Sequence, residues 1–171
     1  MSDLRVNKTK YINETKRVSF KYDGKNYFGY EGDTLASALL ANGVHLIGRS
    51  FKYHRPRGIM SCGSEEPNAI CQISDKNDLT EPNVRATELE IYDGLEAFSQ
   101  NCWPNVKFDI GGINNLISPL IPAGFYYKTF MWPKSFWKKV YEPLIRMSAG
   151  LGKSPTEPDP DIYDHKYVHY D

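Results

Sequence analysis

The chain has 171 residues, of which 40% are hydrophobic, so it is long enough to form one packed domain with an extension. Its 21 basic residues balance its 21 acidic residues, and this zero net charge argues against a dedicated nucleic-acid-binding protein, whose domain is usually strongly basic. The sequence contains no run of about 18 apolar residues and begins with a polar segment, so we expect neither a membrane span nor a secretory signal. Its three cysteines, without framework spacing, indicate a reducing cytoplasm.

The first element predicted along the chain is a β-hairpin. Apolar and polar side chains alternate from Val18 to Tyr22, which is typical of a strand with one buried face. The dipeptide Asp23-Gly24 follows, and its glycine accepts the positive φ of a tight hairpin turn. The residues up to Tyr30 are expected to form the returning strand.

A short helix is expected after this hairpin. Asp33 or Thr34 can cap its first turn, and Gly43 is a natural left-handed stop. The remaining patterns predict extended segments at 44–48, 68–74 and 84–94, with a turn at 75–83.

The order of these elements predicts an α+β fold. A hairpin, a helix packed across it and further strands describe a ferredoxin-like domain of the β-grasp kind, which we place at residues 17–94, after a flexible arm at 1–16. Residues 95–153 are predicted to form an aromatic-rich, partly helical extension that packs on another surface. Within it, Pro133 suits the first turn of a helix, and Pro143 would bend or end that helix. The acidic, proline-rich tail at 154–171 is typical of a linker.

The most unusual segment is Gly48–Ser64, called the basic segment below, which contains no acidic residue. Its cations are Arg49, Lys52, Arg55 and Arg57. No glycine spacing of a nucleotide-binding loop accompanies them. Contacts at a domain or subunit interface are the favoured interpretation, with Arg55 and Arg57 the first candidates, and an anion or cofactor contact and nucleic-acid binding remain alternatives.

The cysteines raise the question of an iron–sulfur loop. A plant-type 2Fe-2S loop has the spacing C-x4-C-x2-C with a fourth cysteine further on, because four thiolates must converge on two irons. Cys62-Gly63 stands where such a loop would begin, Cys71 follows nine residues later, and the sequence between them contains no cysteine. We therefore expect a vestigial loop without a metal, formed around Cys62 and Cys71. No arrangement of Ser, His, Asp or Cys predicts a catalytic nucleophile.

Three long blocks of the sequence resemble one known family. They are YEGDTLASALLANGVHLIGRSFKYHRPRGIMSCGSEEPNAICQI, VRATELEIYDGLEAFSQNCWP and PAGFYYKTFMWPKSFWKKVYEPLIR, in this order. Together they resemble the N-terminal region of the alpha subunit of heterotetrameric sarcosine oxidase, over roughly residues 17–165. Blocks of this length and composition are far more specific than a short motif.

The resemblance implies a fold and a setting. The corresponding region of the family is a ferredoxin-like β-grasp domain without its cluster, followed by a dinucleotide-binding domain that this sequence does not contain. The whole enzyme oxidatively demethylates sarcosine to glycine, transfers the one-carbon unit to tetrahydrofolate, and carries FAD, FMN and NAD. The implied partners are the rest of the alpha subunit and the beta, gamma and delta subunits, with no nucleic acid and no membrane. No catalytic residue and no cofactor maps onto this chain.

The alternative to this assembly role is a 2Fe-2S electron-transfer module of an amine or amino-acid dehydrogenase.

Overall fold

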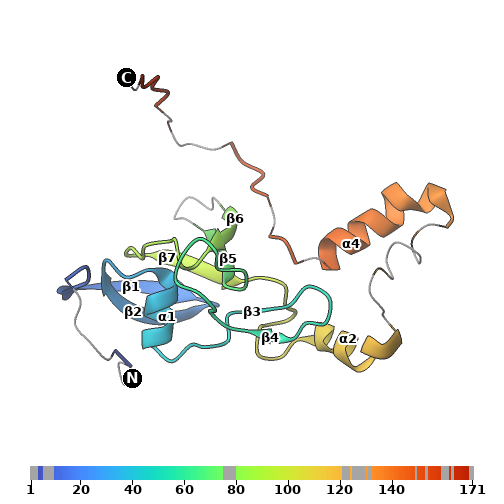
Figure 1. Cartoon of the computed structure of the whole chain (residues 1–171), viewed down its shortest axis with the longest axis horizontal. Coiled ribbons are helices and arrows are strands. Elements are labelled where there is room, and N and C mark those ends of the chain that lie inside the picture. Colours follow the sequence, from blue (N-terminus) through green and yellow to red (C-terminus); the bar gives the residue numbers. More distant parts are fainter. Residues whose placement is uncertain are drawn as a thin grey trace.

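The computed structural model describes residues 4–5, 10–74, 80–120, 124, 130, 132–148, 150–152, 154–158, 162 and 164–169. Figure 1 shows a sheet with one helix across it, a small hairpin beside it and a helical arm set apart from it. The strands are β1 (Asn13–Tyr22), β2 (Lys25–Glu31), β3 (Gly48–Arg49), β4 (Pro56–Arg57), β5 (Ile70–Ser74), β6 (Thr80–Arg85) and β7 (Leu95–Ser99). The helices are α1 (Leu35–Ala41), η1 (Ile110–Gly112), α2 (Ile113–Leu116), η2 (Ser118–Leu120), η3 (Lys134–Phe136), η4 (Trp137–Tyr141) and α4 (Glu142–Ser148).

The main sheet has five strands in the order β2-β1-β7-β5-β6, so it is a mixed sheet in an α+β fold. Strands β1 and β7 are parallel neighbours, with Phe20 opposite Leu95, and every other pair in this sheet is antiparallel. The sheet is longer in sequence than the predicted domain at 17–94. Strand β1 begins at Asn13, inside the predicted arm, and β7 ends at Ser99, inside the predicted extension.

The predicted hairpin is confirmed. Asp23 and Gly24 have φ values of 47° and 73°, the left-handed pair that matches the twist of the two strands. The turn also contacts the central strand, because the Asp23 carboxylate accepts bonds from the backbone N–H and the hydroxyl of Ser99, at 2.8 and 3.0 Å. The turn residue therefore fixes the register of the hairpin against the end of β7.

The predicted helix is also confirmed, with Thr34 as its N-cap and Gly43 at a φ of 74° after its end. Leu35 and Leu39 are completely buried against the sheet, where they meet Phe20. Fully burying each such side chain contributes about 1.5–3 kcal/mol. The core consists of Val18, Phe20, Tyr22, Tyr27, Leu35, Ala36, Ala38, Leu39, Ile47, Ala69, Cys71, Ala86, Ile91, Leu95 and Ala97.

The strand predicted at 84–94 is wrong beyond Arg85, where β6 ends. The residues directly after it bond to helix α1 and the turn before that helix, and the chain returns to β1 only at Asp93 and Gly94. Leu35 donates its backbone N–H to the carbonyl of Leu89 at 2.8 Å, and Ala36 donates to the carbonyl of Ala86 at 2.8 Å. This segment thereby satisfies two of the N–H groups that a helix N-terminus leaves without a partner. The turn predicted at 75–83 gives way to β6 from Thr80, and residues 75–79 lie outside the described residues.

The helical arm runs from η3 through η4 into α4. Pro133 stands directly before η3, as predicted, but Pro143 does not end the helix, because α4 continues to Ser148. Large side chains remain exposed in the arm and just before it, such as Trp137 at 49% and Trp132 at 82%. None of the helices in the described part of the chain has the length and apolar character needed to cross a membrane.

Asp33 connects three parts of the domain at the turn between β2 and α1. Its side chain is fully buried and forms an ion pair with Arg5, whose second terminal nitrogen lies 3.0 Å from the other carboxylate oxygen. The same carboxylate accepts the backbone N–H of Tyr30 at 2.9 Å and the hydroxyl of Ser37 at 2.7 Å. Asp33 therefore holds the end of β2, the first turn of α1 and the N-terminal segment together.

We expect Asp33→Asn to lower the free energy of unfolding by about 3–5 kcal/mol, because it leaves the partly buried Arg5 cation without its counter-charge. The neighbouring Thr34→Ala is the matched control and should cost about 1 kcal/mol, the usual effect of losing an N-cap. Urea unfolding followed by circular dichroism measures both. Equal losses for the two variants would show that the ion pair is not the anchor of this turn.

Candidate functional site

The four cations of the basic segment lie in and around the β3–β4 hairpin, and Arg49 is bound within the chain. Its Nε donates to the carbonyl of Val106 at 2.8 Å. Its two terminal nitrogens donate to the carbonyls of His54 at 3.2 Å and Lys107 at 3.1 Å. Three backbone carbonyls therefore hold the guanidinium, and Arg49 fastens the hairpin to the segment that leads into η1.

The other three cations differ in how much they are used internally. Lys52 and Arg55 both lie over the ring of Tyr53, with Nζ at 4.9 Å and Cζ at 4.8 Å from the ring centre. Arg55 also donates from Nε to the side-chain oxygen of Asn115 at 2.9 Å. Arg57 is exposed, and its side chain forms no hydrogen bond or ion pair within the described part of the chain. The predicted interface role stays a prediction, and Arg57 is the cation best placed for it.

A histidine and an aspartate form a second contact between the same two segments. His54 Nδ1 lies 2.6 Å from Asp109 Oδ2, with 12% and 1% of the two side chains exposed. The other carboxylate oxygen accepts the backbone N–H groups of Trp103 at 3.0 Å and Gly111 at 3.1 Å. Gly111 lies against the imidazole so closely that a Cβ there would overlap the ring. This close approach requires glycine.

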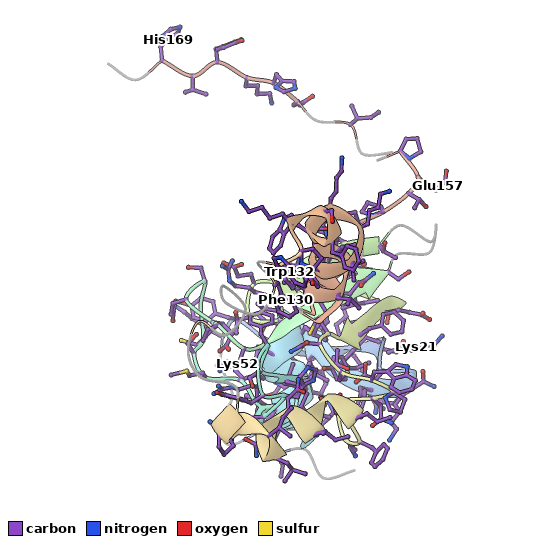
Figure 2. The ribbon with its side chains drawn as sticks, turned by 90° about the vertical axis from the view of Figure 1, so that its right-hand side faces the viewer. Lys21, Lys52, Phe130, Trp132, Glu157 and His169 are labelled. Carbon is purple, nitrogen blue, oxygen red and sulfur yellow. The ribbon has the colours of Figure 1, made fainter. Side chains whose placement is uncertain are left out.

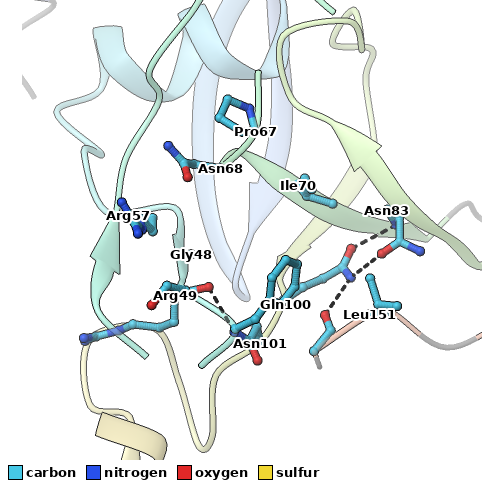
Figure 3. A pocket seen from close by; sticks show the side chains of 13 residues that line it. Gly48, Arg49, Arg57, Pro67, Asn68, Ile70, Asn83, Gln100, Asn101 and Leu151 are labelled. Atoms are coloured by element: carbon cyan, nitrogen blue, oxygen red, sulfur yellow. Dashed lines mark hydrogen bonds between the residues drawn. The ribbon is translucent and has the colours of Figure 1, made fainter. Parts of the chain in front are cut away.

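A pocket of about 140 Å³ lies beside the β3–β4 hairpin, between β5 and residues 150–151. Figure 3 shows Gln100 and Asn83 bonded to each other on one side of it, with Arg57 across from them. The Gln100 amide also donates to the carbonyl of Gly150 at 3.2 Å. The amides that line the pocket therefore bond mainly within the chain, and Arg57 is the charged group that remains available there.

The β4–β5 loop, residues 58–69, is organised by Glu66, whose side chain points into the protein and is only 1% exposed. One of its carboxylate oxygens accepts the backbone N–H groups of Met60 and Ser61 at 2.7 and 2.6 Å. The other accepts those of Asn68 and Ala69 at 2.7 and 3.1 Å. Four N–H donors from both ends of the loop thus converge on one carboxylate.

This environment keeps Glu66 ionised. Burial alone would raise the pKa of its carboxyl, but the four N–H donors outweigh that effect and hold the pKa below its ordinary value of 4.5. The loop is also fixed from outside, because the hydroxyl of Thr87 donates to the carbonyl of Gly63 at 2.8 Å. An internal negative charge therefore closes the loop.

The three cysteines of the chain do not fit a 2Fe-2S cluster, which takes four thiolates in loops of this kind. Cys62 is exposed in the β4–β5 loop, whereas Cys71 is buried in β5, where burial raises the pKa of its thiol to about 12. Cys102 follows β7, and its Sγ lies 3.3 Å from the hydroxyl of Ser99. Burial raises the pKa of this thiol as well. Among the described residues, no three His, Cys, Asp or Glu side chains come together as metal ligands.

Sequence reasoning identified the basic segment but missed Glu66 and the pair of His54 with Asp109. Glu66 stands in the sequence GSEEPN, which has the composition of an exposed turn. Its neighbour Glu65 is indeed exposed, so the composition gives no signal that one of the two acids is buried. Asp109 lies 55 residues from His54, and no local pattern connects them.

Comparison with known proteins identifies a matching family and several relatives of this chain. Residues 15–102 match the profile of the 2Fe-2S iron-sulfur cluster binding domain family. The chain is 56% identical over all 171 residues to the sarcosine oxidase subunit alpha of Rhizobium meliloti (strain 1021), and covers 17% of that protein. It is 41% identical over 88 residues to the sarcosine oxidase subunit alpha of Corynebacterium sp. (strain U-96), which is 50% of this chain and 9% of that protein.

Among solved structures, the L-proline dehydrogenase from P. horikoshii matches 55% of this chain and 17% of its own, with 23% identity and a TM-score of 0.41. The resemblance expected from the three sequence blocks is thus confirmed at the level of homology. The chain spans less than a fifth of the length of the relatives that it matches.

We expect Glu66→Gln to lower the free energy of unfolding by about 2–4 kcal/mol, because the amide nitrogen would face two N–H donors that then lack an acceptor. Glu65→Gln is the matched control, because this adjacent carboxylate is exposed, and it should change stability by less than about 0.5 kcal/mol. Urea unfolding curves measure the difference. Indistinguishable midpoints for the two variants would show that the carboxylate is not what holds the loop.

The same variant should alter the response to acid. Because the pKa of Glu66 in the folded protein lies below 4.5, its contribution to stability is complete above that pH and is lost as the pH falls through the folded value. The free energy of unfolding of the wild type should therefore fall more steeply below about pH 4.5 than that of Glu66→Gln.

Proposed function

Because the chain belongs to the 2Fe-2S iron-sulfur cluster binding domain family, we propose that it is a ferredoxin-like part of a sarcosine oxidase alpha subunit that has kept the fold for assembly. One observation carries this proposal, the 56% identity to a sarcosine oxidase subunit alpha over the full 171 residues. That relative is a subunit alpha, which implies a complex of several subunits. In our proposal this chain contributes a rigid surface to such a complex and no catalytic residue.

The strand order supports a β-grasp fold. A central parallel pair, β1 and β7, is extended on each side by an antiparallel neighbour, with α1 packed across the sheet. The ends of the sheet support a domain of about residues 13–99 in place of the predicted 17–94. The family match at 15–102 has similar limits.

Two observations support a domain that works without a cluster. The cysteines are distributed over a loop, a buried strand position and a second loop, and they number three in the whole chain. In addition, the carboxylate of Glu66 already accepts N–H groups of the β4–β5 loop, which contains Cys62 and in which we expected a vestigial cluster loop. A 2Fe-2S electron-transfer module, the alternative, would need four thiolates, whereas this loop contributes one cysteine and a buried carboxylate.

For the whole complex we propose the oxidation of sarcosine, the reaction after which the relatives are named. In this proposal sarcosine is oxidatively demethylated to glycine, the one-carbon unit passes to tetrahydrofolate, and FAD, FMN and NAD are bound by other parts of the complex. The partners are the rest of the alpha subunit and the beta, gamma and delta subunits. We propose a cytoplasmic location, where the free cysteines stay reduced.

The part of the predicted extension, 95–153, that follows β7 is proposed to contact these partners. It exposes large apolar side chains such as Trp103, Trp132 and Leu144. Figure 2 shows Glu157 and His169 lying away from the folded domain, and the described residues of this tail, 154–158, 162 and 164–169, are exposed. This supports a linker at 154–171 toward a further domain.

Iron analysis tests the cluster-free part of the proposal. Produced in a host that assembles iron–sulfur clusters, the chain should purify without stoichiometric iron or acid-labile sulfide and without visible absorption, because its thiols do not converge. A plant-type ferredoxin produced in parallel is the positive control. A brown protein with equal amounts of iron and sulfide would favour the electron-transfer alternative.

Association tests the assembly part. The purified chain should bind the rest of the alpha subunit and the other subunits from the same organism with a Kd on the order of micromolar or below. Titration calorimetry measures this affinity, with Asp33→Asn as an unstable reference that should bind less. Absence of binding at these concentrations would count against the assembly function.

A further inference from the structure

The helical stretch formed by η1, α2 and the C-cap residue Ile117 carries its apolar side chains outward. Ile110, Ile113, Leu116 and Ile117, which we call the apolar stripe, are 42%, 56%, 80% and 42% exposed. Their spacing of three, three and one residues places them on one face of a helix. A face of this kind is normally buried against its own domain, so here the helix is turned the opposite way.

The polar side of the same helix explains this orientation. Asn114 donates from its side chain to the carbonyl of Lys52 at 3.3 Å, and Asn115 accepts from Arg55 at 2.9 Å. These two bonds fix the polar side of α2 on the basic segment. Figure 1 shows α2 directly beside β4, at the border of the folded domain. The apolar stripe is therefore held facing solvent by specific contacts.

The exposed charged side chains of the two described segments next to the stripe, 48–64 and 103–117, have one sign. The basic segment contributes Arg55 and Arg57, both exposed, and the approach to η1 contributes the exposed Lys107. The basic segment contains no acidic residue. Residues 103–117 contain one, Asp109, whose side chain is only 1% exposed and is bound to His54. In a chain without net charge, this face combines an apolar stripe with a positive border.

We propose that the apolar stripe and its border, Arg55, Arg57 and Lys107, dock another protein subunit that presents an apolar groove bordered by Asp and Glu side chains. The inference rests on the proposed function, because it identifies which surface performs the assembly. Charge complementarity selects an acidic border, and opposite charges across an interface fix register and speed association. The stripe is the expected centre of the binding energy, since buried apolar anchors dominate such interfaces.

A protein partner is favoured over a membrane. Helices that lie on lipid bilayers carry their positive charges on the polar face and insert a long apolar face. Here the apolar stripe occupies only residues 110–117, and the polar face of α2 is occupied by bonds to Lys52 and Arg55. A short anchor with a charged border on one side fits a groove better than a lipid surface.

The test is a titration of the full chain with the remaining subunits from the same organism. Leu116→Ser should raise the Kd about tenfold or more, as expected for a central anchor. Leu40→Ser is the matched control, because Leu40 is an exposed leucine (38%) on a different helix, α1, and should leave the Kd unchanged. Arg57→Glu should also weaken binding and reduce its dependence on salt, whereas Lys25→Glu, an exposed lysine at the β1–β2 turn, should not.

The outcomes separate this inference from the proposed function. If the wild type binds and Leu116→Ser binds equally well, the inference is overturned and the assembly function stands. If the wild type binds none of the subunits, both fail. Self-association that Leu116→Ser abolishes, or Leu116-dependent binding to phosphatidylcholine vesicles containing phosphatidylserine, would identify a second copy or a membrane as the occupant and would also overturn it.

Discussion

The β4–β5 loop depends on one buried negative charge. Four backbone N–H groups from the two ends of the loop converge on the Glu66 carboxylate, and without it they would lose this acceptor. The loop in turn positions Ala69, whose carbonyl accepts the backbone N–H of Ala86 at 2.8 Å. Through that bond the loop supports the segment that covers the N-terminus of α1, so a single side chain influences the loop, the segment and the helix.

Two other carboxylates act in the same way. Asp33 gathers Arg5, Ser37 and the backbone of Tyr30 at the turn before α1. Asp109 gathers His54 and two backbone N–H groups where the chain leaves the sheet. The side chain of each of these acids is almost inaccessible to solvent. Its carboxylate accepts backbone N–H groups at a turn or loop, where the chain has no regular partner strand or helix. A domain with short strands and long connections obtains much of its definition from such polar anchors.

The elements that could be predicted from sequence are those with local signals. Alternation and Asp23-Gly24 identified the first hairpin, and Thr34 with Gly43 identified α1. Prediction failed at 84–94 because Leu89 and Ile91 have the spacing of a strand, while their backbone bonds to α1 and its preceding turn.

At the site, the cations were visible from composition, but their partners were not. Arg49 bonds to carbonyls 57 and 58 residues away, and the burial of Glu66 depends on how its loop closes. Neither relation leaves a trace in a short window of sequence. The apolar stripe was equally hidden, because its period is that of an ordinary packed helix and only the contacts of Asn114 and Asn115 reveal which side faces outward.

Glu66 has a consequence for how the protein matures. The charge that closes the β4–β5 loop is part of the polypeptide, so it is present as soon as the chain leaves the ribosome. The four bonds that close the loop therefore form between groups of the chain itself. The conformation of this loop is consequently set by its own residues and by the ionised state of one side chain.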